Sequence, residues 1–521
     1  MQPETILLLP ILIPLVFGLA IVPLCRKKPV LAASLAFLAV VLSAMAYWRI
    51  AGNFSIRFVQ PWLGQFELSF SLTQWKGLLL GFALVFQLMT GVYVMRYVRR
   101  LPRPAMFLMF TLVAFASAAG VILTDNLLVL LVAWEIFLVA LYALIHSGGP
   151  QAHGTALKAL IIGGGSDFLM ILGLLLFFDL HPAQTIGAHI QVGGSFQAFA
   201  SFFLLFLGAG AKAGMFPFHT WIPDAAEVMP APGFAALPAS HEKLLGIYFL
   251  FLITHEMFTL NATAQTLMYI FAVVTVFVSI VPALVEKNLR RVLALTAIAP
   301  VGFMIAGLAT SEIAGMAGAL ILMLTHATYK STMFFCAGNL EEESGSPMLE
   351  KLQGLAWRMP LTALGFVLAF TAAVSLPPTG GFMSKELIFE GLVERGHYAV
   401  FILLWLGAIL IMAVFCKLMG VLWSATEQRA RTEGFSLQTL PVLLLGLGAV
   451  MSGAIFNAVA PAFNAAMGTA DSHWVSAMWH LSPLTMASYC VYLFGLLLFL
   501  AFRLQAGSSV AAFDSLTDSP V

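Results

Sequence analysis

The chain has 521 residues, of which 61% are hydrophobic and only 9% are charged. Soluble domains carry about 25% charged residues, so this composition excludes an ordinary soluble protein and predicts a polytopic membrane protein. A membrane span needs about 20 apolar residues, and apolar runs of that length recur along most of the chain.

We predict 14 or 15 transmembrane helices from these runs. They cover approximately residues 4–24, 29–49, 76–97, 105–123, 126–147, 157–179, 198–216, 236–255, 263–284, 292–310, 313–338, 361–393 (broken), 398–424, 438–460 and 484–503. The first run lacks a basic leading segment and a cleavage site, so we expect a retained span rather than a signal peptide.

The distribution of lysine and arginine predicts the orientation. With the N-terminus outside, sixteen of the 25 basic residues fall at ends or loops on one side, and only four fall opposite. The positive-inside rule places the first set in the cytoplasm, together with the C-terminus. We expect the cytoplasmic membrane of a bacterium or archaeon. The remaining five lie within spans or their breaks: Lys212, Lys243, Lys330, Lys385 and Lys417.

The motifs indicate that this chain works without a redox centre of its own. Its four cysteines are isolated, and their spacing supports neither a metal site, an iron–sulfur cluster nor a disulfide framework. No GxGxxG or Walker A motif follows a strand. We therefore expect no bound cofactor, no metal and no catalytic site, and we expect the driving free energy to come from elsewhere.

Four regions are predicted along the chain. Residues 1–104 hold N-terminal helices and a short extracytoplasmic β-hairpin, because Ser55–Thr73 alternates apolar and polar residues around a turn. Residues 105–255 and 256–424 form two halves, each with a broken helix, near Pro217 and near Pro377. Residues 425–521 hold C-terminal helices and a short cytoplasmic tail.

Two acidic residues lie in apolar runs of the first half. Glu135 stands near the middle of NLLVLLVAWEIFLVALYALI, and Asp167 follows a glycine run in the next span. Buried acids in membranes are rare and mark ion paths by default. Glu135 is expected to pair with a lysine of another helix, unless it is protonated and hydrogen-bonded. For Asp167 an ion-path role and a structural hydrogen bond are both open.

The stretch Gly208–Tyr248 contains the first break. Lys212 and His219 would share one face of a continuous helix. However, Pro217 has no N–H and its ring clashes with the carbonyl of Ala213, so the helix should kink or unwind there. This leaves an unpaired carbonyl within one turn of an ammonium group. Lys243, near the start of the following helix, is a second candidate; for both lysines the alternative is that they extend to the interface.

The second half repeats this pattern. His326 and Lys330 are spaced i, i+4 in one span, where a neutral imidazole can relay a proton near pH 7. A half-helix then ends at Pro377–Pro378, and Lys385 and Glu386 begin the next. Glu386 also opens an acidic series with Glu390 and Glu394, which could instead be a hydrated helix end. Lys417 lies near a cytoplasmic end, which favours an interfacial role.

The two breaks lie about 160 residues apart in similar contexts, as in two repeats of about five helices with matching broken helices. The predicted fold class is an all-α polytopic membrane protein with 14 or 15 spans and two inverted five-helix repeats, each containing a broken helix.

Three segments resemble the antiporter-like subunits of respiratory complex I, membrane-bound [NiFe] hydrogenases and multi-subunit Na⁺/H⁺ antiporters. They are FPFHTWIPDA (216–225), HATYKSTMFFCAG (326–338) and PPTGGFMSKE (377–386), and the resemblance extends over roughly residues 75–425. It implies a central polar axis: a glutamate–lysine pair, further lysines and a histidine, and a final lysine or glutamate on the second broken helix. Carried over by motif, its members are Glu135, Lys212, Lys243, His326, Lys330 and Lys385. Asp167 resembles an acidic position of some members, and Lys243 stands one residue out of register.

The resemblance implies a proton-translocating membrane subunit of a complex I-like redox pump, of the NADH–quinone oxidoreductase or hydrogenase type. Its partners would be other membrane subunits, a peripheral arm with iron–sulfur clusters and the lipid bilayer, with no nucleic acid. No counterpart of the long lateral helix of one subfamily follows the last span, which favours a mid-array or hydrogenase-type subunit. The alternatives are a Na⁺/H⁺ antiporter subunit, the membrane partner of an inorganic-carbon uptake complex, and a passive scaffold.

Overall fold

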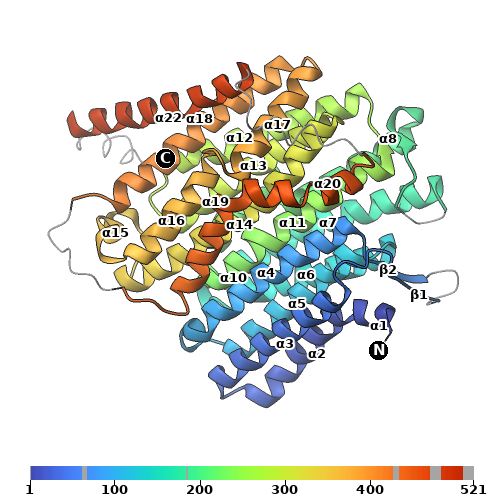
Figure 1. Cartoon of the computed structure of the whole chain (residues 1–521), viewed down its shortest axis with the longest axis horizontal. Helices are drawn as coiled ribbons and strands as arrows, with labels where there is room; N and C mark the ends of the chain where they lie inside the picture. The colour runs from blue at the N-terminus through green and yellow to red at the C-terminus, as the bar shows by residue number, and fades with distance from the viewer. Residues whose placement is uncertain (1, 62–66, 183–185, 426–432, 470–482, 509–521) are drawn as a thin grey trace.

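The structure is a computed structural model that describes residues 2–61, 67–182, 186–425, 433–469 and 483–508. It is a broad bundle of helices in which the N-terminal helices lie at one edge and the last described helix, Pro483–Ser508, lies at the opposite edge (Figure 1). Eleven of the described helices are long and apolar enough to cross a membrane, and three shorter apolar helices accompany them. The predicted all-α polytopic fold is confirmed.

The helices are α1 (Pro3–Leu7), α2 (Leu9–Cys25), α3 (Pro29–Ile50), α4 (Gln74–Tyr97), α5 (Pro104–Leu123), α6 (Leu127–His146), α7 (His153–Leu180), α8 (Phe196–Ala213), α9 (Trp221–Val228), α10 (Ala231–Ala236), α11 (Glu242–Phe251), α12 (Ala262–Val285), α13 (Leu289–Ala309), α14 (Ile313–Ser344), α15 (Leu355–Arg358), α16 (Pro360–Ala373), α17 (Gly380–Glu394), α18 (Tyr398–Leu422), α19 (Thr439–Ala458), α20 (Ala460–Ala466) and α22 (Pro483–Ser508). The strands are β1 (Arg57–Pro61), β2 (Glu67–Ser71), β3 (Ile190–Gln191) and β4 (Phe258–Thr259).

Helix ends are closed by side chains and by glycine. The side chains of Thr73, Asn126, Ser195, Asn261, Asn288 and Thr379 accept hydrogen bonds from the first free N–H groups of the helices that follow them. Helices α8 and α14 end at glycines with positive φ, Gly214 and Gly345. Such closure matters in a membrane, where an unsatisfied backbone group costs several kcal/mol.

The predicted β-hairpin is confirmed. Strands β1 and β2 pair antiparallel, with Arg57 opposite Ser71, and they project from one end of the bundle (Figure 1). Lys76, in the first turn of α4, anchors the hairpin. Its ammonium lies 2.5 Å from Asp125 and also donates to Ser71 and to the carbonyls of Leu123 and Thr124. This lysine therefore has a structural role.

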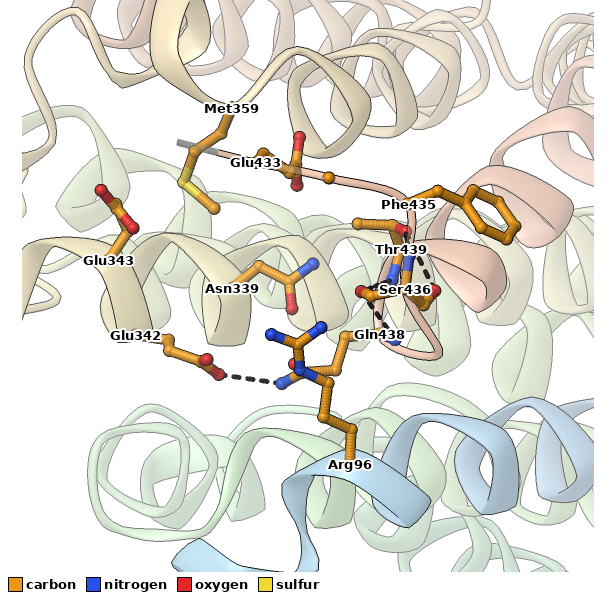
Figure 2. A pocket seen from close by; sticks show the side chains of 11 residues that line it. Arg96, Asn339, Glu342, Glu343, Met359, Glu433, Phe435, Ser436, Gln438 and Thr439 are labelled. Atoms are coloured by element: carbon orange, nitrogen blue, oxygen red, sulfur yellow. Dashed lines mark hydrogen bonds between the residues drawn. The ribbon is translucent and has the colours of Figure 1, made fainter. Parts of the chain in front are cut away.

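A polar pocket of about 300 Å³ opens at the end of the bundle where the basic loops lie (Figure 2). It is formed by the ends of α4, α14 and α16 and the beginning of α19. Asn339 points into it, and Glu342 accepts a hydrogen bond from Gln438 across its floor at 2.9 Å. Glu433 lies on the opposite wall and accepts the backbone N–H groups of Leu361 and Thr362, which closes the N-terminus of α16.

Candidate functional site

Ionisable side chains are buried through the middle of the bundle. Nine of them are at most 8% exposed: Asp167, Lys212, His241, Glu242, Lys243, His326, Lys330, Lys385 and Glu386. Seven of these nine were proposed as path residues from the sequence, and only His241 and Glu242 were not. Charges at this depth are costly, so their number indicates a functional site rather than packing.

The first break forms at the predicted place. Helix α8 ends at Ala213, Gly214 adopts a left-handed conformation (φ +91°), and the chain continues through a 3₁₀ turn at Phe218–Thr220 into α9. Because the helix ends here, Lys212 and His219 do not share a helix face as predicted. His219 lies beyond the break, half-buried, with its ring 6.1 Å from that of Phe216.

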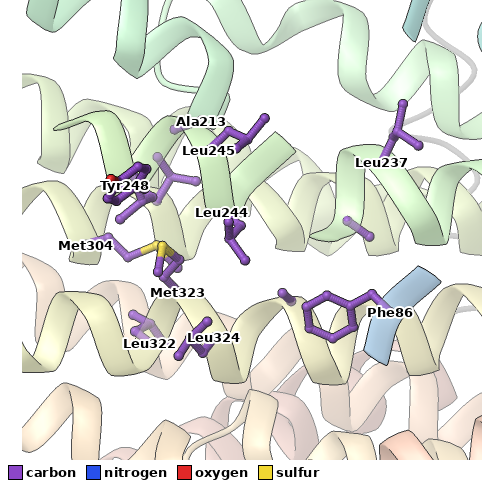
Figure 3. Close-up of a cluster of buried hydrophobic side chains, with 14 of the residues drawn as sticks. Phe86, Ala213, Leu237, Leu244, Leu245, Tyr248, Met304, Leu322, Met323 and Leu324 are labelled. Carbon is purple, nitrogen blue, oxygen red and sulfur yellow. The ribbon is translucent and has the colours of Figure 1, made fainter. Parts of the chain in front are cut away.

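The unpaired carbonyl predicted at this break is that of Ala213. It accepts a hydrogen bond of 2.6 Å from the Lys243 ammonium, not from Lys212. The negative end of the α8 dipole therefore faces a cation. Helix α11 comes this close because Gly246 has no side chain: a Cβ there would lie 2.4 Å from the Ala213 nitrogen. Figure 3 shows Leu245 of α11 beside Ala213, within the apolar cluster that encloses the break.

Lys243 is more central than the sequence suggested. The predicted helix began near residue 236, which put Lys243 near its start and left an interfacial position open. The structure instead continues the helical path from Ala231 through a π-helical segment, Leu237–His241, into α11. Lys243 is therefore well inside the bundle and 0% exposed. Pro232 does not interrupt this path because it stands in the first turn of α10, where its missing N–H has no partner to lose.

Lys212 pairs with Asp167, and this differs from the predicted pair with Glu135. The Lys212 ammonium lies 3.4 Å from the Asp167 carboxylate. Asp167 also accepts from the indole N–H of Trp134 at 2.8 Å, and the ammonium lies 4.9 Å from the centroid of that indole. Glu135 is half-buried, and the described part of the chain offers it no hydrogen bond or ion pair with Lys212. Its place on the path stays a prediction.

Two buried groups beside Lys243 were not proposed as site residues from the sequence. Glu242 is 1% exposed, and its Oε2 has no hydrogen-bond partner among the described residues. Together with Lys212 it lines a cavity of about 10 Å³, room for about one water. The ring nitrogens of His241 face the carbonyls of Ala236 and Ala83. Three consecutive ionisable residues in an apolar segment, His241–Glu242–Lys243, are the pattern that could have identified both groups.

His326 and Lys330 lie one turn apart on α14, as predicted. The Lys330 ammonium donates to the Thr296 hydroxyl at 2.7 Å and to the carbonyl of Leu293 at 3.0 Å. Within the described residues, neither ring nitrogen of His326 has a side-chain or backbone partner of good geometry. A fully buried imidazole without partners is positioned to exchange a proton rather than to hold a fixed bond.

The second break separates α16 from α17, as predicted. Lys385 and Glu386 lie in the second turn of α17, rather than at its start. The Lys385 ammonium is 5.2 Å from the centroid of Phe303, and Glu386 accepts from the Ser488 hydroxyl of α22. Tyr492 of α22 donates to the carbonyl of Ser375 within the break. No pattern in the sequence pointed to Ser488, because a serine in an apolar helix is common.

A second small cavity lies beside this break. It measures about 10 Å³ and is lined by Lys385, Glu386, Ser488 and Tyr492, among others. Each break thus has beside it a small cavity that is lined by one lysine and one glutamate and has room for about one water. Beyond the cavity, Glu390 is half-buried and Glu394 is exposed, as expected for a helix that ends in a hydrated region.

Lys417 was predicted to extend to the interface, and the structure instead gives its ammonium backbone partners at a helix end. Its ammonium donates to the carbonyls of Leu284 at 2.9 Å and Glu286 at 2.6 Å, which closes the C-terminus of α12. Next to it, Arg291 contacts Asp224, Glu227 and Glu286 at 2.9–3.2 Å. Burial raises the pKa of Glu286, but backbone N–H groups and the Arg291 guanidinium outweigh it and hold the pKa below its ordinary value.

The fold and these residues define a class: polytopic membrane proteins with two broken helices joined by buried charges, the arrangement of ion-translocating subunits. A sequence model of the family described as NADH:quinone oxidoreductase/Mrp antiporter, transmembrane, matches residues 124–411. The chain belongs to this family. Among the residues that the structure describes, no group of three or more His, Cys, Asp or Glu side chains is placed to hold a metal ion.

Among its relatives is NADH-quinone oxidoreductase subunit N of Desulforudis audaxviator, which is 30% identical over an alignment of 482 residues that covers 87% of this chain and 96% of the relative. The structure of the Mrp complex from Dietzia sp. contains a chain that matches with a TM-score of 0.81 at 18% identity, over 92% of this chain and 100% of that one. A chain of respiratory complex I from Thermus thermophilus matches with a TM-score of 0.72 at 23% identity, over 89% and 99%.

Proposed function

We propose that this chain is a proton-translocating membrane subunit of a complex I-like, redox-driven pump. The observation that carries the proposal is the axis of buried groups that joins the two broken helices: Asp167, Lys212, Glu242, Lys243, His326, Lys330, Lys385 and Glu386. A relative named as subunit N of an NADH-quinone oxidoreductase supports the redox-driven type.

The proposed mechanism begins at the Asp167–Lys212 pair. At 3.4 Å and an effective dielectric constant of 20, the attraction between two unit charges is on the order of 5 kcal/mol. Moving one charge across 100 mV costs about 2.3 kcal/mol. Separating or closing this pair therefore changes the local potential enough to drive one proton. Glu135, one residue beyond Trp134, is the acid that would exchange with Asp167 as the partner of Lys212.

A change in the charge of the Asp167–Lys212 pair acts on the ionisable groups next to it. Glu242 shares a cavity with Lys212, and Lys243 is held at the carbonyl beside Lys212. A shift in charge at Lys212 therefore acts on the proton affinity of both groups, and through them on His326 and Lys330. Release would take place at Lys385 and Glu386, which lie beside the second break.

The remaining parts of the proposal concern the assembly. We infer that the partners are other membrane subunits and a peripheral arm with iron–sulfur clusters, that the membrane is the cytoplasmic membrane of a prokaryote, and that the N-terminus lies outside with the C-terminus inside. This chain would bind no cofactor. A second candidate is a subunit of a Na⁺/H⁺ antiporter, which the match to a chain of an Mrp complex favours.

The test uses the intact complex with proton translocation and electron transfer assayed separately. Lys212→Ala and Glu135→Gln should each abolish or strongly reduce translocation. Lys417→Met is the matched control, because that lysine is also partly buried but closes a helix end. Unchanged translocation in both test variants would contradict the proposal. Purification with antiporter subunits and without redox subunits would support the second candidate.

A further inference from the structure

An apolar cavity lies apart from the axis of buried charges, between the N-terminal helices and the second half. Helices α3 and α19 both pack against α4, and α14 also contacts α4 and α19 (Figure 1). These four helices enclose a cavity of about 400 Å³. Pockets that hold small molecules measure about 300–1,000 Å³, whereas packed interiors contain few voids larger than a water molecule. A space of this size therefore calls for an occupant.

The wall of the cavity suits an apolar occupant. Of the lining residues that the structure describes, only Tyr47, Thr328 and Ser452 carry a polar side chain. Each donates its hydroxyl proton to a backbone carbonyl, at 2.9 Å from Tyr47, 2.8 Å from Thr328 and 2.6 Å from Ser452. A buried water needs two to four polar partners, and cavities lined by apolar side chains stay dry. The cavity therefore favours hydrocarbon over water.

Gly448 contributes to the volume of the cavity. A Cβ at this position would meet one atom within 4 Å, the methyl carbon of Thr328 at 3.8 Å, which is an ordinary contact. Gly453 on the same helix differs, because a Cβ there would lie 2.0 Å from the carbonyl oxygen of Pro378. Glycine destabilises a helix relative to alanine. Helix packing explains Gly453, whereas at Gly448 the missing side chain leaves space in the cavity.

The cavity has an exposed rim and a buried floor. At the rim, Val85, Leu444 and Ile455 are 38–46% exposed, and at the floor Phe86 and Leu445 are at most 4% exposed. Exposed apolar side chains of membrane-spanning helices face lipid or another subunit. The rim is therefore an opening through which a hydrocarbon chain of the bilayer can enter.

The shape of the cavity excludes a helix as its occupant. The lining residues extend from Leu78 to Phe86 along α4 and from Leu444 to Phe456 along α19, about 12 and 18 Å at 1.5 Å per residue. A helix about 10 Å across would fill roughly 1,200 Å³ over 15 Å of length, about three times the volume of the cavity. An acyl chain is apolar, long and thin, so it matches both the length and the volume.

One end of the cavity lies near a membrane surface. Tyr47, Leu78 and Ile455 each stand about one turn from the end of their helix on the side where the β-hairpin projects. Beside Tyr47, Trp48 and Arg49 are exposed and line a second groove of about 370 Å³ between α3 and α4. Tryptophan is enriched at membrane interfaces, and arginine binds phosphate oxygens through two N–H groups. This end therefore fits an anionic headgroup with two chains.

We propose that the cavity between α3, α4, α14 and α19 binds an acyl chain of an anionic phospholipid. The phosphate lies beside Arg49 at the hairpin end, and the second chain lies in the groove between α3 and α4. The lipid thereby completes the packing of the N-terminal helices against α19. The proposal does not depend on proton translocation, so it stands or fails separately from the proposed function.

The test uses the intact complex in vesicles of phosphatidylethanolamine and phosphatidylglycerol, in which some phosphatidylglycerol carries a diazirine in the middle of one acyl chain. After illumination, labelled residues are identified by mass spectrometry. Phe86 and Leu445 report a chain inside the cavity, because bulk lipid does not reach the floor. Leu447, which is 52% exposed, reports bulk lipid. We expect label on all three residues, and a floor without label would overturn the proposal.

Gly448→Leu fills the cavity with a side chain. It should lower labelling of the floor about tenfold, the change produced by about 1.4 kcal/mol of affinity, while labelling of Leu447 stays the same. The matched control is Gly165→Leu on α7, where a Cβ would meet no atom within 4 Å. Equal floor labelling in the two variants would overturn the proposal. If Gly448→Leu does not assemble, Val85→Trp at the rim decides: it should block entry, and full floor labelling would contradict the site.

Two further arms identify the occupant. Arg49→Gln removes the partner of the phosphate and should weaken floor labelling by the phosphatidylglycerol probe, and unchanged labelling would contradict the headgroup position. Excess unlabelled phosphatidylglycerol should displace the probe from the floor. If a benzoquinone with an isoprenoid tail displaces it and phosphatidylglycerol does not, the occupant is a quinone tail and the proposal is wrong.

Discussion

The close contact between α11 and the first break gives a sharp prediction for Gly246→Ala. The new Cβ would lie 2.4 Å from the nitrogen and 2.7 Å from the Cα of Ala213. These are backbone atoms and cannot move aside as a flexible side chain can. Ordinary contacts begin near 3.5 Å, so α11 must move away from the break by about 1 Å.

This displacement of α11 moves Lys243 away from the Ala213 carbonyl. Its hydrogen bond to the Ala213 carbonyl would lengthen from 2.6 Å by about the same amount, beyond the range of a hydrogen bond. A hydrogen bond of a charged group contributes about 1.5–3 kcal/mol, and overpacking costs about 1–3 kcal/mol. Alanine in place of glycine returns at most about 1 kcal/mol of helix propensity. We therefore expect a net destabilisation of about 2–4 kcal/mol and impaired proton translocation.

The assay compares thermal unfolding of the purified complex and its translocation rate with those of Gly154→Ala. Gly154 lies in α7, and a Cβ there meets no atom within 4 Å, so this control gains propensity without a clash. If Gly246→Ala unfolds at the same temperature as the control and translocates protons normally, the hydrogen bond between Lys243 and the Ala213 carbonyl contributes neither to stability nor to translocation.

Three further predictions follow from other parts of the structure. Asp167→Asn leaves the Lys212 ammonium without its 3.4 Å partner, so it should destabilise the complex by about 3–5 kcal/mol in thermal unfolding, whereas Glu135→Gln should cost far less; the reverse order would show that Glu135 is the true partner. Thr325→Val removes a buried hydroxyl that has no hydrogen-bond partner among the described residues, so the unfolding temperature should stay equal or rise; a clear loss of stability would contradict this. The pKa of Glu286 is lowered in the folded protein, so its carboxylate adds stability above the unfolded pKa of about 4.3 and loses it as pH falls through the folded value; Glu286→Gln should remove this acid-dependent part, and an unchanged stability–pH curve would argue against it.

The sequence predicted the features that follow from local chemistry. Pro217 predicted the first break and Pro377–Pro378 the second, because proline lacks the N–H that a continuing helix needs. The alternation of residues 55–73 predicted the hairpin. The nearness of Lys417 to a helix end predicted that it lies outside the buried path, although not that it would donate to the carbonyls of α12.

Features that depend on contacts between distant segments could not be predicted. The sequence offers Lys212 two acidic partners, Glu135 on α6 and Asp167 on α7. Only the packing of α6, α7 and α8 brings the Asp167 carboxylate, and not that of Glu135, to the Lys212 ammonium. The donor to the Ala213 carbonyl comes from α11, thirty residues away. Ser488 reaches Glu386 from a helix about a hundred residues later in the chain. None of these partners leaves a local pattern in the sequence.

The central claim is that the buried charges between the two breaks carry protons. The most direct test is the number of protons moved per electron by the intact complex in sealed vesicles when Lys243 is replaced by alanine. Lys243 holds the broken end of α8 and lies beside Lys212 on the proposed path. The account predicts a lower ratio of protons to electrons while electron transfer continues. An unchanged ratio would show that protons do not pass through this axis.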